Sequence, residues 1–77
     1  MTRKRDNEAH KLRRNTVQTI SYRCATPGPD IEESSIDGFW TGDIDTWGKR
    51  TIRLIRPMDG CDVIYLFDRE VVTVDDY

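Results

Sequence analysis

The chain has 77 residues, of which 36% are hydrophobic and 34% are charged, and its formal net charge is −2. This length suits one small domain, and such a domain buries only about 60% of the surface that its unfolded chain exposes. No apolar run approaches the ~20 residues of a membrane span, and no apolar segment follows the first charges as it would in a secretory signal. We therefore expect a cytoplasmic protein that does not enter a membrane.

The charge is divided unevenly along the chain. Residues 1–23 carry seven Lys and Arg against two acidic residues, a net charge of +5. Residues 24–77 carry five Lys and Arg against twelve acidic residues, a net charge of −7. The pattern predicts a basic arm joined to an acidic body.

Residues 1–15 form the basic part. Asp6, Asn7 and Glu8 resemble a helix start. The cations at Lys11, Arg13 and Arg14 suit a helix end. Ala9 and Leu12 are the only apolar residues of the span 7–14. A short helix over 7–14 and an unstructured arm both remain open, and the domain proper is expected over 16–77.

Residues 16–24 alternate apolar and polar side chains, which predicts a first strand. The next segment, 25–37, contains Pro27, Gly28 and Pro29 and then a run of acidic and serine residues. Two prolines and a glycine oppose regular structure. We therefore predict a long acidic loop over residues 25–37.

Residues 38–74 contain four short runs rich in β-branched and aromatic residues. A turn at Trp47–Lys49, the stop at Pro57 and the turn dipeptide Asp59–Gly60 separate the first three runs. The last run follows a kink at Asp68–Arg69. This spacing predicts a bent β-meander.

The fold class is therefore mainly β: a small five-stranded barrel of the SH3, Sm or OB group, with a short N-terminal helix or basic arm. Closure would remove the free strand edges that a small sheet otherwise exposes. The most buried residues are expected to be Ile44, Ile52, Leu54, Val63, Tyr65 and Val72.

Residues 38–74 resemble the Sm-like family, which includes the Sm proteins and the bacterial Hfq RNA chaperones. The likeness consists of Gly42 within TGDID, the alternation in residues 51–54, and YLFD at residues 65–68 followed by two valines. It implies a helix before five bent strands, and RNA binding by rings in many members.

Three differences from the Sm-like pattern argue against rings and RNA binding. Leu66 and Phe67 stand where Hfq carries a Lys and a His that hold RNA. The region Trp47–Thr51 lacks the Asp and Asn of the Sm RNA loop. The predicted loop 25–37 replaces a tight turn. The chain is in these respects similar to acidic, monomeric members such as the Rho inhibitor Rof, which implies protein binding.

The sequence contains no catalytic pattern. His10 is the only histidine, and no nucleophile motif, phosphate-binding loop or metal-ligand spacing is present. Cys24 and Cys61 lie far apart without a CxxC motif, so free, partly buried thiols are expected. We expect a non-enzymatic protein without catalytic residues, metal or cofactor.

The first functional hypothesis is a regulator, an inhibitor or adaptor, whose acidic surface engages a protein partner of the nucleic-acid-handling machinery. Acidic patches can occupy basic sites and accelerate association, and an aromatic side chain beside a turn can anchor a partner. The residues assigned to this surface are Asp30, Glu32, Glu33, Asp37 and Trp47.

The alternative hypothesis is RNA or DNA binding. The basic arm would contact phosphates, and the cations beside the Trp47 turn would add a second contact. The residues assigned to it are Arg3, Lys4, Arg5, Lys11, Arg13, Arg14, Lys49 and Arg50.

We expect a monomer or a dimer. The edges of the last two strands are apolar enough to pair with another copy. The acidic surplus, however, would repeat at close quarters around a ring, and like-charge repulsion would oppose its closure.

Overall fold

The computed structural model describes residues 8–25 and 31–77 and, within them, the side chains of residues 8–23 and 33–77. Five strands carry the fold: β1 Gln18–Ala25, β2 Ile31–Ile44, β3 Arg50–Met58, β4 Cys61–Leu66 and β5 Val71–Asp76. Two short 3-10 helices are present, η1 Ala9–Lys11 and η2 Asp68–Glu70. The predicted five strands and the mainly β class are confirmed.

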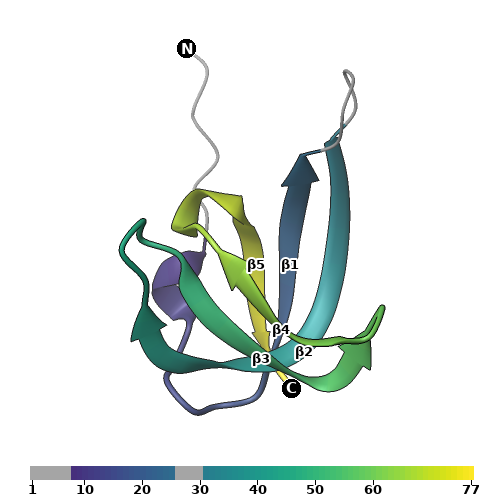
Figure 1. The fold of residues 1–77 in the computed structure, drawn as a ribbon, viewed down its shortest axis with the longest axis horizontal. Coiled ribbons are helices and arrows are strands. Elements are labelled where there is room, and N and C mark those ends of the chain that lie inside the picture. The colour runs from purple at the N-terminus through teal and green to yellow at the C-terminus, as the bar shows by residue number, and fades with distance from the viewer. Residues whose placement is uncertain (1–7, 26–30) are drawn as a thin grey trace.

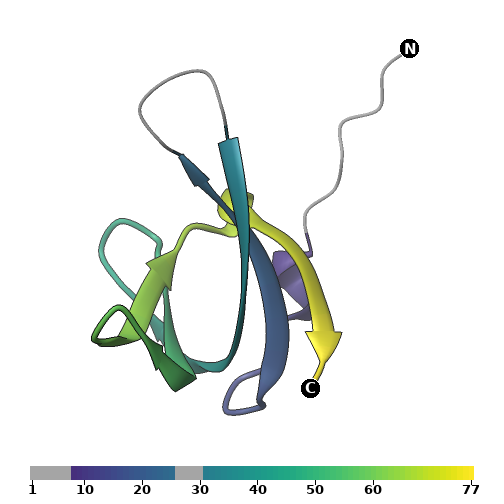
Figure 2. The same cartoon turned by 90° about the vertical axis from the view of Figure 1, so that its right-hand side faces the viewer.

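The strands form one antiparallel sheet in the order β4-β3-β2-β1-β5. The sheet is strongly curved, and β1 and β2 extend beyond it as a two-stranded hairpin (Figures 1 and 2). β4 and β5 are consecutive in the chain but are the two outer strands. The predicted closed barrel is therefore wrong for this sheet, because no ladder joins its outer strands.

The core lies on the concave face of the sheet. Ile20, Ile52 and Val71 are its fully buried side chains. The remaining buried apolar residues are Ala9, Leu12, Tyr22, Ile36, Leu54, Leu66 and Val74. Ala9 and Leu12 come from the N-terminal segment, so the described part of that segment packs into the same core as the strands.

The N-terminal segment forms less helix than the sequence suggested. η1 spans three residues, and the chain is already extended at Leu12. Glu8 does not act as a side-chain cap for η1. Its carboxylate instead accepts a hydrogen bond from the Val74 backbone N–H at 3.0 Å, which ties the segment to β5.

The segment 31–37 differs from the predicted loop because it is the first half of β2. Residues 31–38 pair in continuous register with residues 25–18 of β1. Pairing along the whole of β1 satisfies the backbone groups of both strands, and this outweighs the weak strand propensity of acidic residues and serines. Pro27, Pro29 and Asp30 lie outside the described residues.

The prediction that Ile44 and Tyr65 are buried in the core is wrong. Ile44 is 53% exposed and Tyr65 is 54% exposed. The β2–β3 register shifts between Trp40 and Ile44, where Gly42 adopts a φ of 100°. Such an irregularity moves the following side chain off the inner face.

Tyr65 lies on the outer face because its neighbours Ile64 and Leu66 face inward. Ile64 pairs with the buried Ile52. The prediction was correct for Ile52 and Leu54, which are buried, while Val63 and Val72 are half-buried.

Candidate functional site

The β2–β3 turn presents an exposed tryptophan on an ordered backbone. Asp45 Oδ1 accepts hydrogen bonds from the backbone N–H groups of Trp47 at 2.9 Å and Lys49 at 2.8 Å. Two backbone bonds, Gly48 N to Asp45 O at 3.0 Å and Asp45 N to Lys49 O at 2.9 Å, close the turn. Gly48 adopts a φ of 91°, which glycine tolerates best. Trp47 is 76% exposed at the tip.

Arg50 joins this turn to η2. Its guanidinium donates two hydrogen bonds to the Asp68 carboxylate, at 2.6 and 3.2 Å, and lies 4.4 Å from the centroid of the Trp40 ring. The Arg50 side chain is only 15% exposed. This hydrogen bond lowers the pKa of Asp68, and the fork of two bonds fixes the guanidinium plane against the indole.

Phe67 lies next to this pair and has two cations on its ring. Lys49 Nζ is 5.1 Å from the ring centroid, and Arg69 Cζ is 4.2 Å from it. Glu70 holds the backbone at this bend, because its Oε1 accepts the Phe67 N–H at 2.8 Å while its own N–H donates to the Phe67 carbonyl at 2.9 Å. The two connections, residues 45–49 and 67–70, therefore meet at one end of the sheet.

We call this surface the aromatic rim. Its members come from β2, β3 and the two connections, and they are Trp40, Trp47, Lys49, Arg50, Phe67, Asp68 and Arg69.

The N-terminal segment contacts β2 at Trp40, a residue of the aromatic rim, and at Gly42. Asn15 N–H donates to the Trp40 carbonyl at 2.7 Å, and Arg14 forms a parallel bridge with Trp40. A Cβ at Gly42 would lie 2.5 Å from Arg14 Cδ, so the missing side chain makes room for the arginine stem. The Trp40 indole N–H donates to the Asp43 carbonyl at 3.0 Å, which fixes the ring.

The residues assigned to protein binding lie in two places. Glu33 and Asp37 lie on β2 in the half that pairs with β1, while Trp47 lies beyond the other end of the strand. Glu33 is opposite Arg23 in the β1–β2 register, and Asp37 accepts a hydrogen bond from the Thr19 hydroxyl at 2.7 Å. Asp30 and the Glu32 side chain lie outside the described part of the chain.

The residues assigned to nucleic-acid binding are divided in a similar way. Arg14 and Arg50 both contact Trp40 or its neighbours, and Lys49 is on the same rim. Lys11 instead pairs with Glu8 at 3.2 Å, and Arg13 pairs with Asp76 at 3.0 Å. Arg3, Lys4 and Arg5 are not among the described residues.

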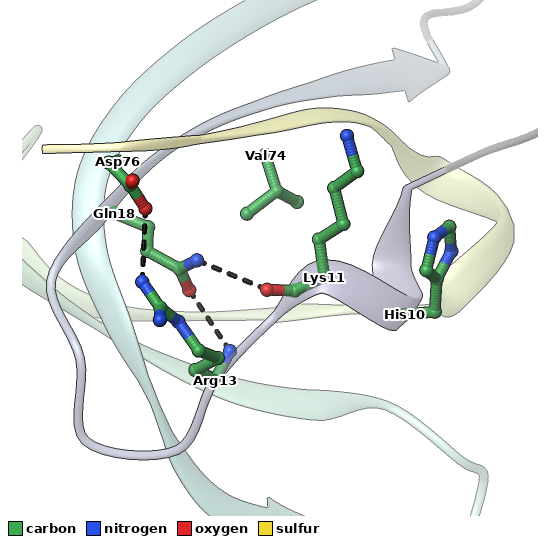
Figure 3. A pocket seen from close by; sticks show the side chains of 6 residues that line it. All are labelled: His10, Lys11, Arg13, Gln18, Val74 and Asp76. Carbon is green, nitrogen blue, oxygen red and sulfur yellow. Dashed lines mark hydrogen bonds and ion pairs between the residues drawn. The ribbon is translucent and has the colours of Figure 1, made fainter.

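A shallow hollow of about 350 Å³ lies between η1, β1 and β5, lined by His10, Lys11, Arg13, Gln18, Val74 and Asp76 (Figure 3). Gln18 is 3% exposed and is its best-held polar group. Its Oε1 accepts the Arg13 N–H at 3.0 Å, and its Nε2 donates to the Lys11 carbonyl at 3.1 Å. Both ends of the Gln18 amide thus hold the N-terminal segment against the sheet. We call this contact, together with the Glu8–Val74 hydrogen bond, the N-terminal joint, and we assign the hollow a structural role.

Sequence reasoning missed Trp40, Phe67, Asp68 and Arg69 as parts of the rim. Trp40 is half-buried and packs against the buried core residues. The three others stand in a run, Phe67-Asp68-Arg69, that the sequence indicated only as a kink. Their meeting with residues 49–50 depends on the β3–β4 register, which places Arg50 opposite Leu66.

No family model, curated protein or solved structure matches the chain. Within residues 8–25 and 31–77, no helix has the length and apolar character to cross a membrane. The described side chains also contain no group of three or more His, Cys, Asp or Glu placed to hold a metal ion. Cys61 is a free thiol and is exposed, in contrast to the expected partial burial.

Proposed function

We propose that this chain is a non-enzymatic binding protein that engages a protein partner through the aromatic rim, with Trp47 as the anchor. The observation that carries the proposal is the 76% exposure of Trp47 on a turn held by four hydrogen bonds. Trp and Arg are the residues most enriched among those that dominate interface energy. A side chain on an ordered turn also loses little conformational freedom when it is bound.

The charges of the rim support a protein partner over a nucleic acid. Arg50 pairs with the Asp68 carboxylate, and Asp45 belongs to the same turn as Lys49, so acids and cations alternate here. Phosphate binding rests on a surplus of positive charge along the path of the strand, and this rim has no large surplus. The whole chain, at a net charge of −2, repels polyanions as well.

The role as an inhibitor or adaptor of nucleic-acid-handling machinery is part of the same proposal, supported by the acidic balance of the chain. An Sm-like relationship is also proposed. Its support is a short helix before five antiparallel, curved strands, with Gly42 in the second. Assembly as a monomer or dimer remains a prediction.

Site-specific photo-cross-linking tests the proposal. The cross-linking residue p-benzoylphenylalanine replaces Thr46, which is exposed beside Trp47, so the anchor itself stays intact. In an extract of the source cells we expect a discrete protein adduct whose yield falls at least about tenfold in a Trp47→Ala background. Tyr77→Ala, which removes an exposed aromatic side chain elsewhere, is the matched control and should leave the yield unchanged.

The same cross-linker in place of Ser35, an exposed residue of the hairpin half of β2, should give no adduct of that size. An adduct from position 35 but not from position 46 would transfer the function to the acidic hairpin. An adduct at position 46 that is indifferent to Trp47→Ala would contradict the role of the anchor.

Nucleic-acid binding is the second candidate, and one observation favours it. The Arg14 stem lies against Gly42 beside Trp40, so a cation from the N-terminal segment joins Lys49 and Arg50 on one rim. A gel shift with labelled single-stranded RNA and DNA 20-mers tests it. A shift at micromolar protein that weakens by about one log-log slope unit per phosphate contacted, and that is lost in Arg14→Ala, would favour this candidate.

A further inference from the structure

Lys49 and Arg69 are the two cations of the aromatic rim that the fold leaves without a carboxylate. Each lies over the Phe67 ring, at 5.1 and 4.2 Å from its centroid. Among the described side chains, neither has a carboxylate oxygen within 4.0 Å. Arg50, the third cation of the rim, donates two hydrogen bonds to the Asp68 carboxylate.

The nearby carboxylates are occupied by groups of the chain itself. Asp45 accepts two backbone N–H groups of its turn, and Glu70 accepts the Phe67 N–H. These bonds hold the two connections in shape, so the carboxylates cannot turn toward Lys49 or Arg69 without releasing the turns. The two cations are therefore left to pair with another molecule, and Lys49 belongs to the same turn as the exposed Trp47.

We infer that the partner surface is an apolar pocket that takes the Trp47 indole and is edged by carboxylates that pair with Lys49 and Arg69. This inference rests on the proposed function and names the chemistry of its partner. The Phe67 ring holds both cations, with Lys49 Nζ at 5.1 Å and Arg69 Cζ at 4.2 Å from its centroid, so a partner that reaches this ring meets two positive charges. Carboxylates that binding removes from water would pair with these cations more strongly than solvated ones.

A protein fits this arrangement better than a nucleic acid. A phosphodiester strand carries regularly spaced negative charges, and it would have to pass the Asp68 carboxylate on the same rim. A folded protein can place two carboxylates at chosen points and leave neutral groups opposite these acids. Discrete complementarity of this kind provides specificity and a faster association rate.

Charge reversal with a matched control tests the inference. The test pair is Lys49→Glu with Arg69→Glu, and the control pair is Arg53→Glu with Arg56→Glu. Both pairs change the net charge equally, and the control residues are exposed cations of β3. With the cross-linker at position 46, we expect the adduct yield to fall at least about tenfold for the test pair and less than about twofold for the control pair.

A neutral variant pair, a folding check, the salt dependence and mass spectrometry of the adduct complete the test. The neutral pair Lys49→Gln with Arg69→Gln retains hydrogen-bonding capacity and should lose about threefold in yield, and circular dichroism checks that each variant is folded. Raising NaCl from about 0.05 to about 0.5 M should reduce the wild-type yield and leave that of the neutral pair nearly unchanged. Mass spectrometry of the adduct should find Asp or Glu beside the cross-linked position of the partner.

The outcomes separate this inference from the proposed function. A protein adduct that depends on Trp47 but survives the reversal of Lys49 and Arg69 keeps the proposed function and overturns the acidic pocket. Equal losses in the test and control pairs would show that only net charge matters, which also overturns it. An adduct that nuclease treatment removes would show a nucleic-acid ligand and overturn both, as would the absence of any adduct.

Discussion

The two halves of β2 hold their charged side chains in different ways. From Ile31 to Asp37 the strand pairs with β1 alone, and its described acids face groups of that neighbour: Glu33 lies opposite Arg23, and Asp37 accepts the Thr19 hydroxyl. From Gly38 to Ile44 the strand pairs with β3 and leads into the aromatic rim. Two described acids of the hairpin half thus lie opposite polar groups of β1, while Trp47 beyond the other half is exposed and the neighbouring Lys49 has no carboxylate partner among the described side chains.

This contrast teaches that an acidic stretch is not by itself an acidic surface. The run at residues 32–37 looks like a negatively charged loop in the sequence, yet pairing with β1 places a cation and a hydroxyl opposite two of its acids. The rim looks unremarkable in sequence, because its seven members come from three separate stretches. The aromatic and cationic side chains that we propose for binding gather where distant segments meet and not where like residues follow one another.

The largest expected effect comes from truncating a buried side chain opposite the point where the two halves of β2 join. Leu54 is buried and lies opposite Gly38 in the β2–β3 register. Leu54→Ala should lower the free energy of unfolding by about 2–5 kcal/mol, because it leaves a cavity in a small core. The neighbouring Ile55 is 38% exposed, so Ile55→Ala should cost less than about 1 kcal/mol. Urea denaturation measures both, and equal costs would contradict the inward orientation of Leu54.

A substitution of Gly38 should give the second-largest effect on stability. A Cβ at this position would meet the backbone carbonyl oxygen of Arg53, and a backbone atom of a paired strand cannot move aside easily. Gly38→Ala should therefore destabilise the protein by about 1–3 kcal/mol. Ser35→Ala, at an exposed position in the hairpin half, should stay within about 0.5 kcal/mol of the wild type. Thermal melting of the two variants checks the difference, and a neutral Gly38→Ala would show that β2 and β3 are not so close here.

The pH dependence of stability should give a smaller effect. It compares a carboxylate of the rim, Asp68, with a carboxylate of the N-terminal joint, Glu8. The hydrogen bond from Arg50 lowers the pKa of Asp68, and the hydrogen bond from the Val74 backbone N–H, with help from Lys11, lowers the pKa of Glu8. Groups whose pKa is lower in the folded state stabilise the protein above their usual pKa, and this contribution is lost as pH falls through the folded-state pKa. We expect the free energy of unfolding to be steady down to about pH 5 and to fall below about pH 4.

Two single substitutions divide this acid-dependent loss between the two sites. Asp68→Asn and Glu8→Gln should each make the fall at low pH shallower, and Asp37→Asn in the hairpin half serves as the comparison, because its carboxylate accepts a hydroxyl and not a cation. Denaturant titrations between pH 2 and 7 provide the measurement. A steeper fall in Asp68→Asn would contradict the pairing with Arg50.

Much of the fold follows from local patterns in the sequence. The turns at Trp47–Lys49 and Asp59–Gly60 were predicted from glycine and aspartate, and both connect strands as expected. The buried Ile52 and Leu54 follow from the alternation of one strand. These features depend on a few neighbouring residues, and for that reason they can be predicted without the partner strands.

The features that sequence reasoning missed depend on pairing at long range. The start of β2 is decided by β1, because residues 31–37 have little strand propensity of their own. The inward face of β4 could not be chosen from its sequence, because Val63 and Tyr65 are as apolar as Ile64 and Leu66. Ile44 was misplaced because the glycine at position 42 shifts the register by a backbone conformation that alternation does not reveal.

The candidate site likewise has one part that local sequence predicts and another that depends on strand pairing. The exposure of Trp47 beside a turn was predicted from its position and is confirmed. The pairing of Arg50 with Asp68 and the contact of Lys49 with the Phe67 ring need the β3–β4 register and the bend at η2. Each of these two contacts joins residues 18 positions apart in the chain, and no local pattern specifies them.

The measurement that tests the account most directly is the affinity of the cross-linked partner for Trp47 variants, determined by isothermal titration with the full chain. Trp47→Ala should raise Kd by about 30-fold or more, as expected for an anchor residue, and Trp47→Phe should fall between Trp47→Ala and the wild type. Asp37→Asn, at the other half of β2, should leave Kd within about twofold. A Trp47→Ala variant that binds like the wild type, together with weakened binding by Asp37→Asn, would place the interface on the hairpin and contradict the account.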